Sequence, residues 1–188
     1  DDWKTTRWFT QGMTGTQAGA FEDEWLFVAW YSKHSQKRGV RVSVIKMDPY
    51  SSRWLYRHIL LVDQNGDFLR NQRASVHAGG LALRGQTLYL SDTLCSDEYK
   101  IRAFPFSKLF QIPSKEREKY FDYRYLLKES ASYTVSSKPS FLSYDELKDR
   151  FITGTFYQKR IGSLGQFSLE KESVAIDQVK YQNGLRQM

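Results

Sequence analysis

Short runs of apolar residues recur along the chain, each bounded by glycine, proline, asparagine or serine turns. Clear examples are Trp25–Ser32, Thr87–Thr93 and Arg150–Tyr157, which are rich in aromatic and β-branched side chains. Runs of this length between turn signals are typical of β-strands. No stretch keeps a helical apolar period beyond two turns, and the best helix candidate is Ser114–Tyr120, directly after Pro113. The pattern therefore predicts an all-β chain.

The strand-like runs repeat along the chain. The three runs above start 62 and 63 residues apart. A second class of alternating runs starts at Arg41, Lys100 and Ser163, with spacings of 59 and 63 residues. Because both classes share nearly the same period, the sequence divides into three similar units.

Two further classes of run complete each unit. Tyr56–Val62 and Tyr123–Lys128 share the pattern Tyr-Arg-x-Ile/Leu-Leu, and a glycine- or serine-bearing run opens each unit, at Phe9–Thr14, His77–Leu83 and Ser140–Tyr144. Four strands per repeat predict a β-propeller, because one four-stranded sheet cannot bury both faces and must stack on its neighbours. A β-sandwich with coincidental similarity among short strands is the alternative.

The repeat sets the expected domain boundaries. We expect one domain, with approximate blades at residues 8–63, 76–130 and 139–188. A closed propeller needs about four to eight blades, so three would leave an apolar sheet face open at each end. We therefore expect a second copy of the chain, or a missing second half, to close the ring. The start at Asp1 and the abrupt end at Met188 favour the missing half.

One part of the chain resembles a known group of proteins. Val76–Leu83 and Gln86–Thr93, running into Ile101–Phe104, are similar to the blades of six-bladed propellers of the gluconolactonase/senescence-marker and NHL-type group. The resemblance is close over residues 76–104 and loose over the rest. This group includes exported bacterial propellers of unassigned function, so the resemblance implies architecture more than chemistry.

The lactonase branch of that group holds a divalent metal such as calcium at the channel mouth, through Glu and Asn/Asp side chains. Where that branch has Glu-Gly, this chain has Gln11 and Gly12. A neutral amide is a weaker ligand for a hard cation than a carboxylate. This departure disfavours a metal and the hydrolysis it would support, so no cofactor is expected.

Composition narrows the class of protein. The longest apolar run, Trp25–Tyr31, is far too short for a transmembrane helix. The single cysteine, Cys95, excludes an intramolecular disulfide and a cysteine-rich zinc site. The chain begins at Asp1 without an initiator methionine, which predicts either a trimmed chain or a mature protein whose signal peptide has been removed. On the second interpretation, which we favour, the protein is secreted or periplasmic.

The chain is basic, with 28 Lys and Arg against 21 Asp and Glu and a net charge of +7. Most of this charge is scattered, as on an ordinary solvated surface. The exception is a predicted basic rim loop made of Lys33, His34, Lys37, Arg38 and Arg41. Such a loop is either a solvated hairpin tip or a contact for a polyanion, an acidic glycan rather than nucleic acid.

The candidate ligand site is the predicted channel mouth, with Gln11, His77 and Asp92. His77 directly precedes a glycine-rich inner strand, where its side chain would be a ligand contact, a metal ligand or a general base, or else would hydrogen-bond its neighbours. Asp92 ends a strand, but its counterparts Trp30 and Thr155 are not acids, so no symmetric carboxylate ring is expected. An Asp before a Thr is also a common turn former.

No nucleophile elbow, phosphate loop or His-Glu-x-x-His motif is found, so no catalytic residue is assigned. The sequence therefore predicts an exported propeller module that binds a glycan, peptide or small molecule, and we lean away from an enzyme. A metal-assisted, lactonase-type hydrolase is the alternative. A binder of acidic glycan or nucleic acid through the basic loop is the second.

Overall fold

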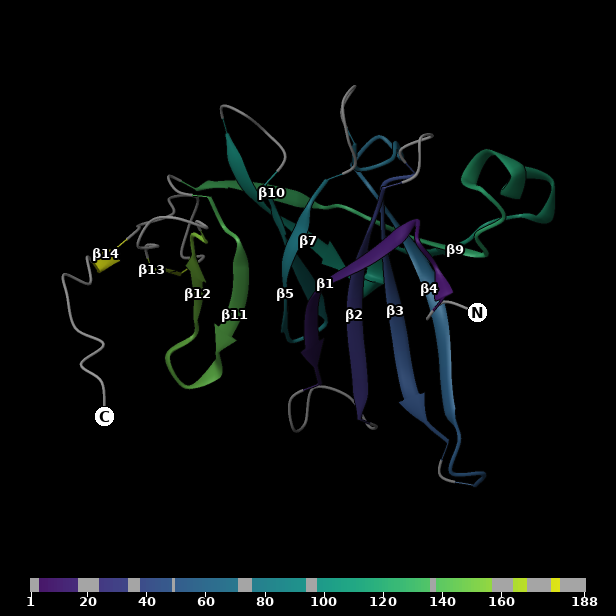
Figure 1. Cartoon of the computed structure of the whole chain (residues 1–188), viewed down its shortest axis with the longest axis horizontal. Coiled ribbons are helices and arrows are strands. Elements are labelled where there is room, and N and C mark those ends of the chain that lie inside the picture. Colours follow the sequence, from purple (N-terminus) through teal and green to yellow (C-terminus); the bar gives the residue numbers. More distant parts are fainter. Residues whose placement is uncertain are drawn as a thin grey trace.

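The computed structural model of the chain describes residues 4–16, 24–33, 38–48, 50–70, 76–93, 98–135, 138–156, 164–168 and 177–179. These residues form a predominantly β structure with short 3-10 helices, as the apolar pattern predicts. Figure 1 shows three sheets that lie side by side along the long axis of the molecule.

Sheet 1 contains the first four strands of the chain in their order along the sequence, each antiparallel to the next. These strands are β1 (Trp8–Gly15), β2 (Trp25–Ser32), β3 (Val40–Met47) and β4 (Trp54–Val62). Two later strands extend the sheet beyond β4, namely β9 (Tyr125–Lys128) and β8 (Leu109–Gln111). The β4–β9 pair is parallel and joins Leu60–Val62 to Leu126–Lys128.

Sheets 2 and 3 are four-stranded and antiparallel. Sheet 2 has the order β10-β7-β6-β5, built from β5 (Ala78–Arg84), β6 (Thr87–Asp92), β7 (Tyr99–Pro105) and β10 (Ala131–Val135). Sheet 3 has the order β11-β12-β13-β14, built from β11 (Phe141–Asp145), β12 (Arg150–Gly154), β13 (Leu164–Phe167) and β14 (Asp177–Val179).

The first strands of the three sheets lie next to one another, with β5 between β1 and β11 (Figure 1). Glycine permits this close approach, because a β-carbon on Gly12 would lie 2.7 Å from the backbone nitrogen of Leu81. A β-carbon on Gly80 would meet the backbone nitrogen of Leu142 in the same way. Gly12 and Gly80 are therefore equivalent positions, and so are Leu81 and Leu142. In β1 the residue equivalent to Leu81 and Leu142 is Met13, which follows Gly12 as Leu81 follows Gly80.

Two apolar cores hold the sheets together. The larger lies between sheets 1 and 2 and includes Phe27, Val42, Leu83 and Phe104, each at most 1% exposed. The second lies between sheets 2 and 3, where the rings of Tyr89 and Phe151 meet with centroids 4.6 Å apart. Burial of each such side chain stabilises the fold by about 1.5–3 kcal/mol, so each sheet depends on its neighbour.

The structure corrects one strand assignment. The run Tyr123–Lys128, predicted as the outer strand of the second unit, contains β9, which pairs with β4 of sheet 1. The fourth strand of sheet 2 is instead β10, where Ala131–Val135 pairs with Tyr99–Ala103. This strand lies just beyond the boundary expected at residue 130.

The described residues include the short 3-10 helices η2 (Phe106–Lys108), η3 (Ser114–Tyr120) and η4 (Glu146–Lys148), which interrupt the strands. The predicted helical segment Ser114–Tyr120 is confirmed as η3, with Pro113 at its N-cap and Phe121 in the left-handed conformation at its end. Within the described residues, no helix has the length and apolarity required to cross a membrane.

Candidate functional site

The starts of β1, β5 and β11 bring three chemically different side chains to equivalent positions. Four residues before Met13, Leu81 and Leu142 stand Phe9, His77 and Lys138. Because the equivalent strands lie side by side, an aromatic ring, an imidazole and an ammonium group gather at one end of the inner strands. Tyr31 and Lys33, at the end of β2, complete this group. We call Phe9, Tyr31, Lys33, His77 and Lys138 the strand-start cluster.

The cluster is held by ring contacts. The rings of Tyr31 and His77 are 4.2 Å apart between centroids, and those of Phe9 and Tyr31 are 5.9 Å apart. The Nζ atom of Lys33 lies 3.8 Å from the centroid of Phe9 and 5.6 Å from that of Tyr31. Tyr31 is buried, whereas Phe9, Lys33 and His77 reach solvent. The cluster thus presents packed aromatic rings with cationic groups beside them.

The electrostatics of the cluster favour an anion. Packing against Tyr31 partly desolvates the imidazole, which lowers the pKa of His77, and the charges of Lys138 and Lys33 lower this pKa further. His77 is therefore neutral at pH 7, and the positive charge of the cluster resides on its two lysines. A bound carboxylate would be attracted by both ammonium groups and would also favour protonation of His77.

The backbone fixes His77 in place. Its carbonyl oxygen accepts a hydrogen bond from the N–H of Gly79 at 2.7 Å and one from the Thr93 hydroxyl at 3.1 Å. The next residue, Ala78, pairs with Asp92 across the β5–β6 ladder. The imidazole is therefore presented by a rigid strand end, as a binding site requires.

The other two predicted channel-mouth residues, Gln11 and Asp92, each have different surroundings from the cluster. Gln11 is exposed and lies in the irregular part of the β1–β2 pairing, between Thr10 and Met13. Asp92 is fully buried, and its carboxylate binds Arg102, with Nε at 2.8 Å. Asp92 thus belongs to a structural ion pair and offers no oxygen to a ligand at the surface.

Arg102 also binds Glu129, with its Nη1 atom 2.7 Å from Oε2. Burial raises the pKa of Glu129, and the opposing effect of Arg102 only partly cancels this increase. Burial alone would lower the pKa of Arg102, but Asp92 and Glu129 together raise it. The three groups therefore form a buried triad that joins β6, β7 and the segment after β9.

The predicted basic rim loop does not form one patch in the described residues. Lys33 belongs to the strand-start cluster, and His34 and Lys37 lie outside the described residues. Arg41 is buried and lies between two indoles, with its guanidinium carbon 4.5 Å from the Trp8 ring and 5.0 Å from the Trp30 ring. Arg38 lies 4.6 Å over Phe121.

Arg38 and Arg41 line a polar hollow of about 350 Å³. Its charged lining residues are Arg38, Arg41, Arg57, Arg124 and Asp122, and His58 contributes an imidazole. His58 is oriented by a hydrogen-bonded chain in which the indole N–H of Trp30 donates to Ser43 Oγ at 2.8 Å, and Ser43 Oγ contacts His58 Nδ1 at 2.9 Å. Of the five residues of the predicted basic rim loop, Arg38 and Arg41 line this guanidinium-rich hollow.

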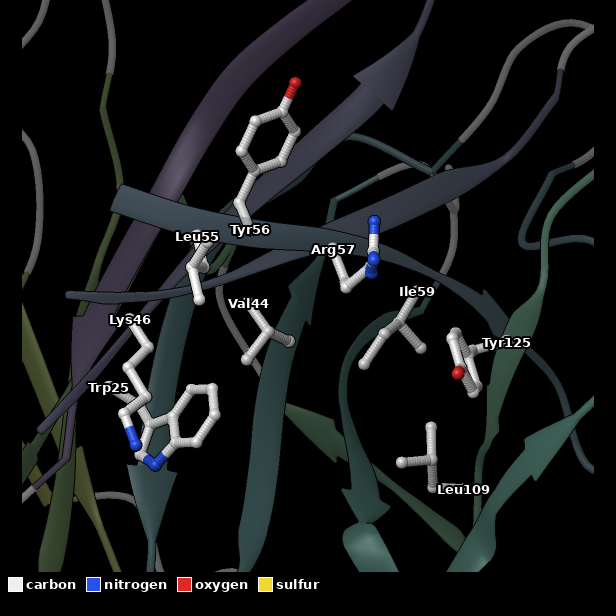
Figure 2. A pocket seen from close by; sticks show the side chains of 9 residues that line it. All are labelled: Trp25, Val44, Lys46, Leu55, Tyr56, Arg57, Ile59, Leu109 and Tyr125. Atoms are coloured by element: carbon white, nitrogen blue, oxygen red, sulfur yellow. The ribbon is translucent and has the colours of Figure 1, made fainter. Parts of the chain in front are cut away.

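An apolar hollow of about 410 Å³ lies beside β4 (Figure 2) and shares Arg57 and Tyr125 with the guanidinium-rich hollow. Figure 2 shows Val44, Ile59, Leu109 and Tyr125 around it, while Tyr56 points away on the far side of β4. Sequence reasoning did not find this hollow, because Leu109 and Tyr125 come from strands that only tertiary pairing brings beside β4.

Within the described ranges, no group of three or more His, Cys, Asp or Glu side chains is arranged to hold a metal ion. The predicted thiol, Cys95, lies outside these ranges. No protein-family model matches the chain, and no curated protein matches its sequence.

Proposed function

We propose that this chain is a binding module that holds an acidic sugar at the strand-start cluster. The observation that carries the proposal is the packed Tyr31–His77 pair beside Lys33 and Lys138, at the place where three inner strands begin. Aromatic rings supply apolar contact area for the C–H face of a sugar ring, and lysines supply charge for its carboxylate. An exported location is part of this proposal.

The fold that we propose for this module is an arc of a β-propeller. The first strands of the three sheets lie side by side, and within each sheet these strands are followed by antiparallel neighbours in sequence order; β8 and β9, which join sheet 1, are the exception. This order supports the assignment. Met13 supports it further, because it is 66% exposed, whereas its equivalents Leu81 and Leu142 are 1% and 6% exposed. In sheets 2 and 3, Leu81 and Leu142 pack against the sheet that precedes them. Met13 has the equivalent position in sheet 1 but is exposed. A further sheet, from a second copy or from additional chain, would cover Met13.

Calorimetric titration with trigalacturonate tests the binding site. We expect His77→Ala and Lys138→Gln each to weaken binding by about tenfold or more, equal to about 1.4 kcal/mol, because each removes a direct contact. Lys115→Gln, an exposed lysine on η3, is the matched control and should bind like the parent chain. Maltotriose, a neutral trisaccharide, should bind far more weakly. Equal affinity for both sugars, or for all variants, would refute the acidic-sugar site.

A second candidate function is the binding of an acidic glycan chain through the guanidinium-rich hollow. Four arginines against one aspartate among its lining residues favour it. Its signature is an affinity for heparin that falls steeply with salt and is reduced by Arg57→Gln and Arg124→Gln. A lactonase-type hydrolysis has less support, because Gln11 is an amide and Asp92 is bound by Arg102.

A further inference from the structure

The arrangement of the strand-start cluster continues on sheet 3. In each sheet, one residue of the first strand pairs with an equivalent residue of the second strand, and these pairs are Met13↔Val28, Leu81↔Leu90 and Leu142↔Thr153. Three residues after each second-strand partner stand Tyr31, Thr93 and Phe156. Phe156 is therefore the counterpart in sheet 3 of Tyr31, the central ring of the cluster.

The end of β12 is held next to Lys138. The hydroxyl of Thr155 donates a hydrogen bond to the carbonyl oxygen of Lys138 at 2.9 Å, and the N–H of Phe156 donates to Ser140 Oγ at 3.0 Å. The backbone N–H of Ser140 donates to the carbonyl oxygen of Gly154 at 2.7 Å. These hydrogen bonds fix Phe156 and Lys138 on adjoining segments of backbone.

The side chains at this end of the inner strands thus form a row across the three sheets. From sheet 1 to sheet 3, the row contains Phe9, Tyr31, His77, Thr93, Lys138 and Phe156. This order follows from the packing of the strands, since β5 lies between β1 and β11 (Figure 1). A phenylalanine stands at each end of the row, and each is accompanied by a lysine.

The row offers more aromatic surface to a ligand at its sheet 3 end than at its centre. Phe156 is 68% exposed and Phe9 is 37% exposed, whereas Tyr31 is only 7% exposed. An exposed ring on a fixed backbone provides apolar contact area for the C–H face of a sugar, with little loss of side-chain freedom. A ligand can cover Phe156 without any change in the buried core.

The lysines of the row lie on both sides of its imidazole. Lys33 follows β2 of sheet 1, and Lys138 precedes β11 of sheet 3. The charges of both lysines lower the pKa of His77, so both ammonium groups are close enough to act on this ring. A ligand with a negative charge on each of its units can meet both ammonium groups at once, which a single acidic sugar ring cannot do.

We propose that Phe156 and Lys138 form a second subsite, so that the ligand is a chain of uronic acid units that runs along the row. One unit lies on Phe9 beside Lys33, the next lies at His77, and a third lies on Phe156 beside Lys138. This inference rests on the proposed binding of an acidic sugar. It adds the length of the ligand and the line along which the ligand lies.

Calorimetric titration with galacturonate, digalacturonate and trigalacturonate tests the second subsite. In the parent chain we expect the affinity to rise with each unit, by about tenfold or more in total. Phe156→Ser should weaken trigalacturonate about fivefold or more and leave galacturonate unchanged, because only the longer ligand reaches this ring. Phe156→Tyr should bind like the parent chain. Phe110→Ser, which removes a 50% exposed ring from β8, is the matched control and should also bind like the parent chain.

The outcomes separate this inference from the proposed function. If none of the three sugars binds, the acidic-sugar site and the second subsite are both wrong. If His77→Ala weakens trigalacturonate but Phe156→Ser does not, the sugar site stands and the second subsite is overturned. An affinity that does not depend on chain length, or an equal loss for galacturonate and trigalacturonate in Phe156→Ser, would also overturn it. Sedimentation that shows dimers lost in Phe156→Ser would assign this ring to a contact between copies of the chain instead.

Discussion

Gly12 and Leu81 touch through their backbones, so no side chain fits between β1 and β5 at this point. A β-carbon on Gly12 would lie 2.7 Å from the Leu81 nitrogen, and Gly80 has the same relation to Leu142. We expect Gly12→Ala and Gly80→Ala to destabilise the fold by about 1–3 kcal/mol, because the sheets must move apart. Gly15→Ala, whose nearest atom would be 3.4 Å away, is the matched control. Chemical denaturation measures the differences, and an unperturbed Gly80→Ala would refute the close-approach argument.

Arg102 neutralises two carboxylates that are almost wholly buried, since Asp92 is 0% and Glu129 2% exposed. Arg102→Met should therefore cost about 3–5 kcal/mol of stability at pH 7, because it leaves uncompensated buried charge. The loss should shrink as the pH falls towards 5, since burial raises the pKa of Glu129 and this carboxylate can then take up a proton. Denaturation at both pH values checks this, and a loss that does not depend on pH would contradict it.

His77 makes stability depend on pH with a definite sign. Its pKa is lowered in the folded chain, so the unfolded chain binds the proton more tightly. The contribution of neutral His77 is therefore fully present above its ordinary pKa of about 6.5, and is lost as the pH falls below that value. Between pH 8 and pH 5 the melting temperature of the parent chain should fall more than that of His77→Gln. Parallel curves for the two proteins would show that His77 is not perturbed.

Arg84 and Asp149 join sheets 2 and 3 at the surface. The guanidinium donates to both carboxylate oxygens, with Nε at 2.7 Å and Nη2 at 2.6 Å, and the Tyr144 hydroxyl donates to the same carboxylate at 2.5 Å. Because Arg84 and Asp149 are 38% and 57% exposed, Arg84→Gln should cost no more than about 1 kcal/mol. Raising the salt concentration should reduce this cost. A cost that is large and independent of salt would indicate a packing role for Arg84.

The sequence was most informative about local strand structure. Aromatic and β-branched runs such as Trp25–Ser32 form strands, because burial between sheets stabilises these side chains in the folded chain. Pairing partners were harder to predict. Tyr125–Lys128 has the apolar content of an outer strand of sheet 2, yet it pairs with β4. Ala131–Val135 was missed because this short run is partly polar and its pairing with β7 leaves no pattern of its own.

For the candidate site too, the sequence indicated a local feature but not the residues that tertiary packing brings beside it. His77 could be singled out because it precedes Ala78 and a glycine pair at a strand start. Its neighbours Tyr31 and Lys138 are distant in sequence, so only the packing of β5 between β1 and β11 brings them together. Asp92 was assigned to the mouth because the sequence does not reveal that Arg102 will cover it.

The late arrival of β9 in sheet 1 has a consequence for biosynthesis. Val62 pairs with Lys128, so the ribosome must make residues 63–128 before the parallel β4–β9 pair can form. At about 5–20 residues per second, the nascent chain spends several seconds with this whole side of β4 uncovered. A product truncated after Val62 would keep that apolar edge permanently, and such edges template aggregation. Productive folding of sheet 1 is therefore coupled to continued translation through sheet 2.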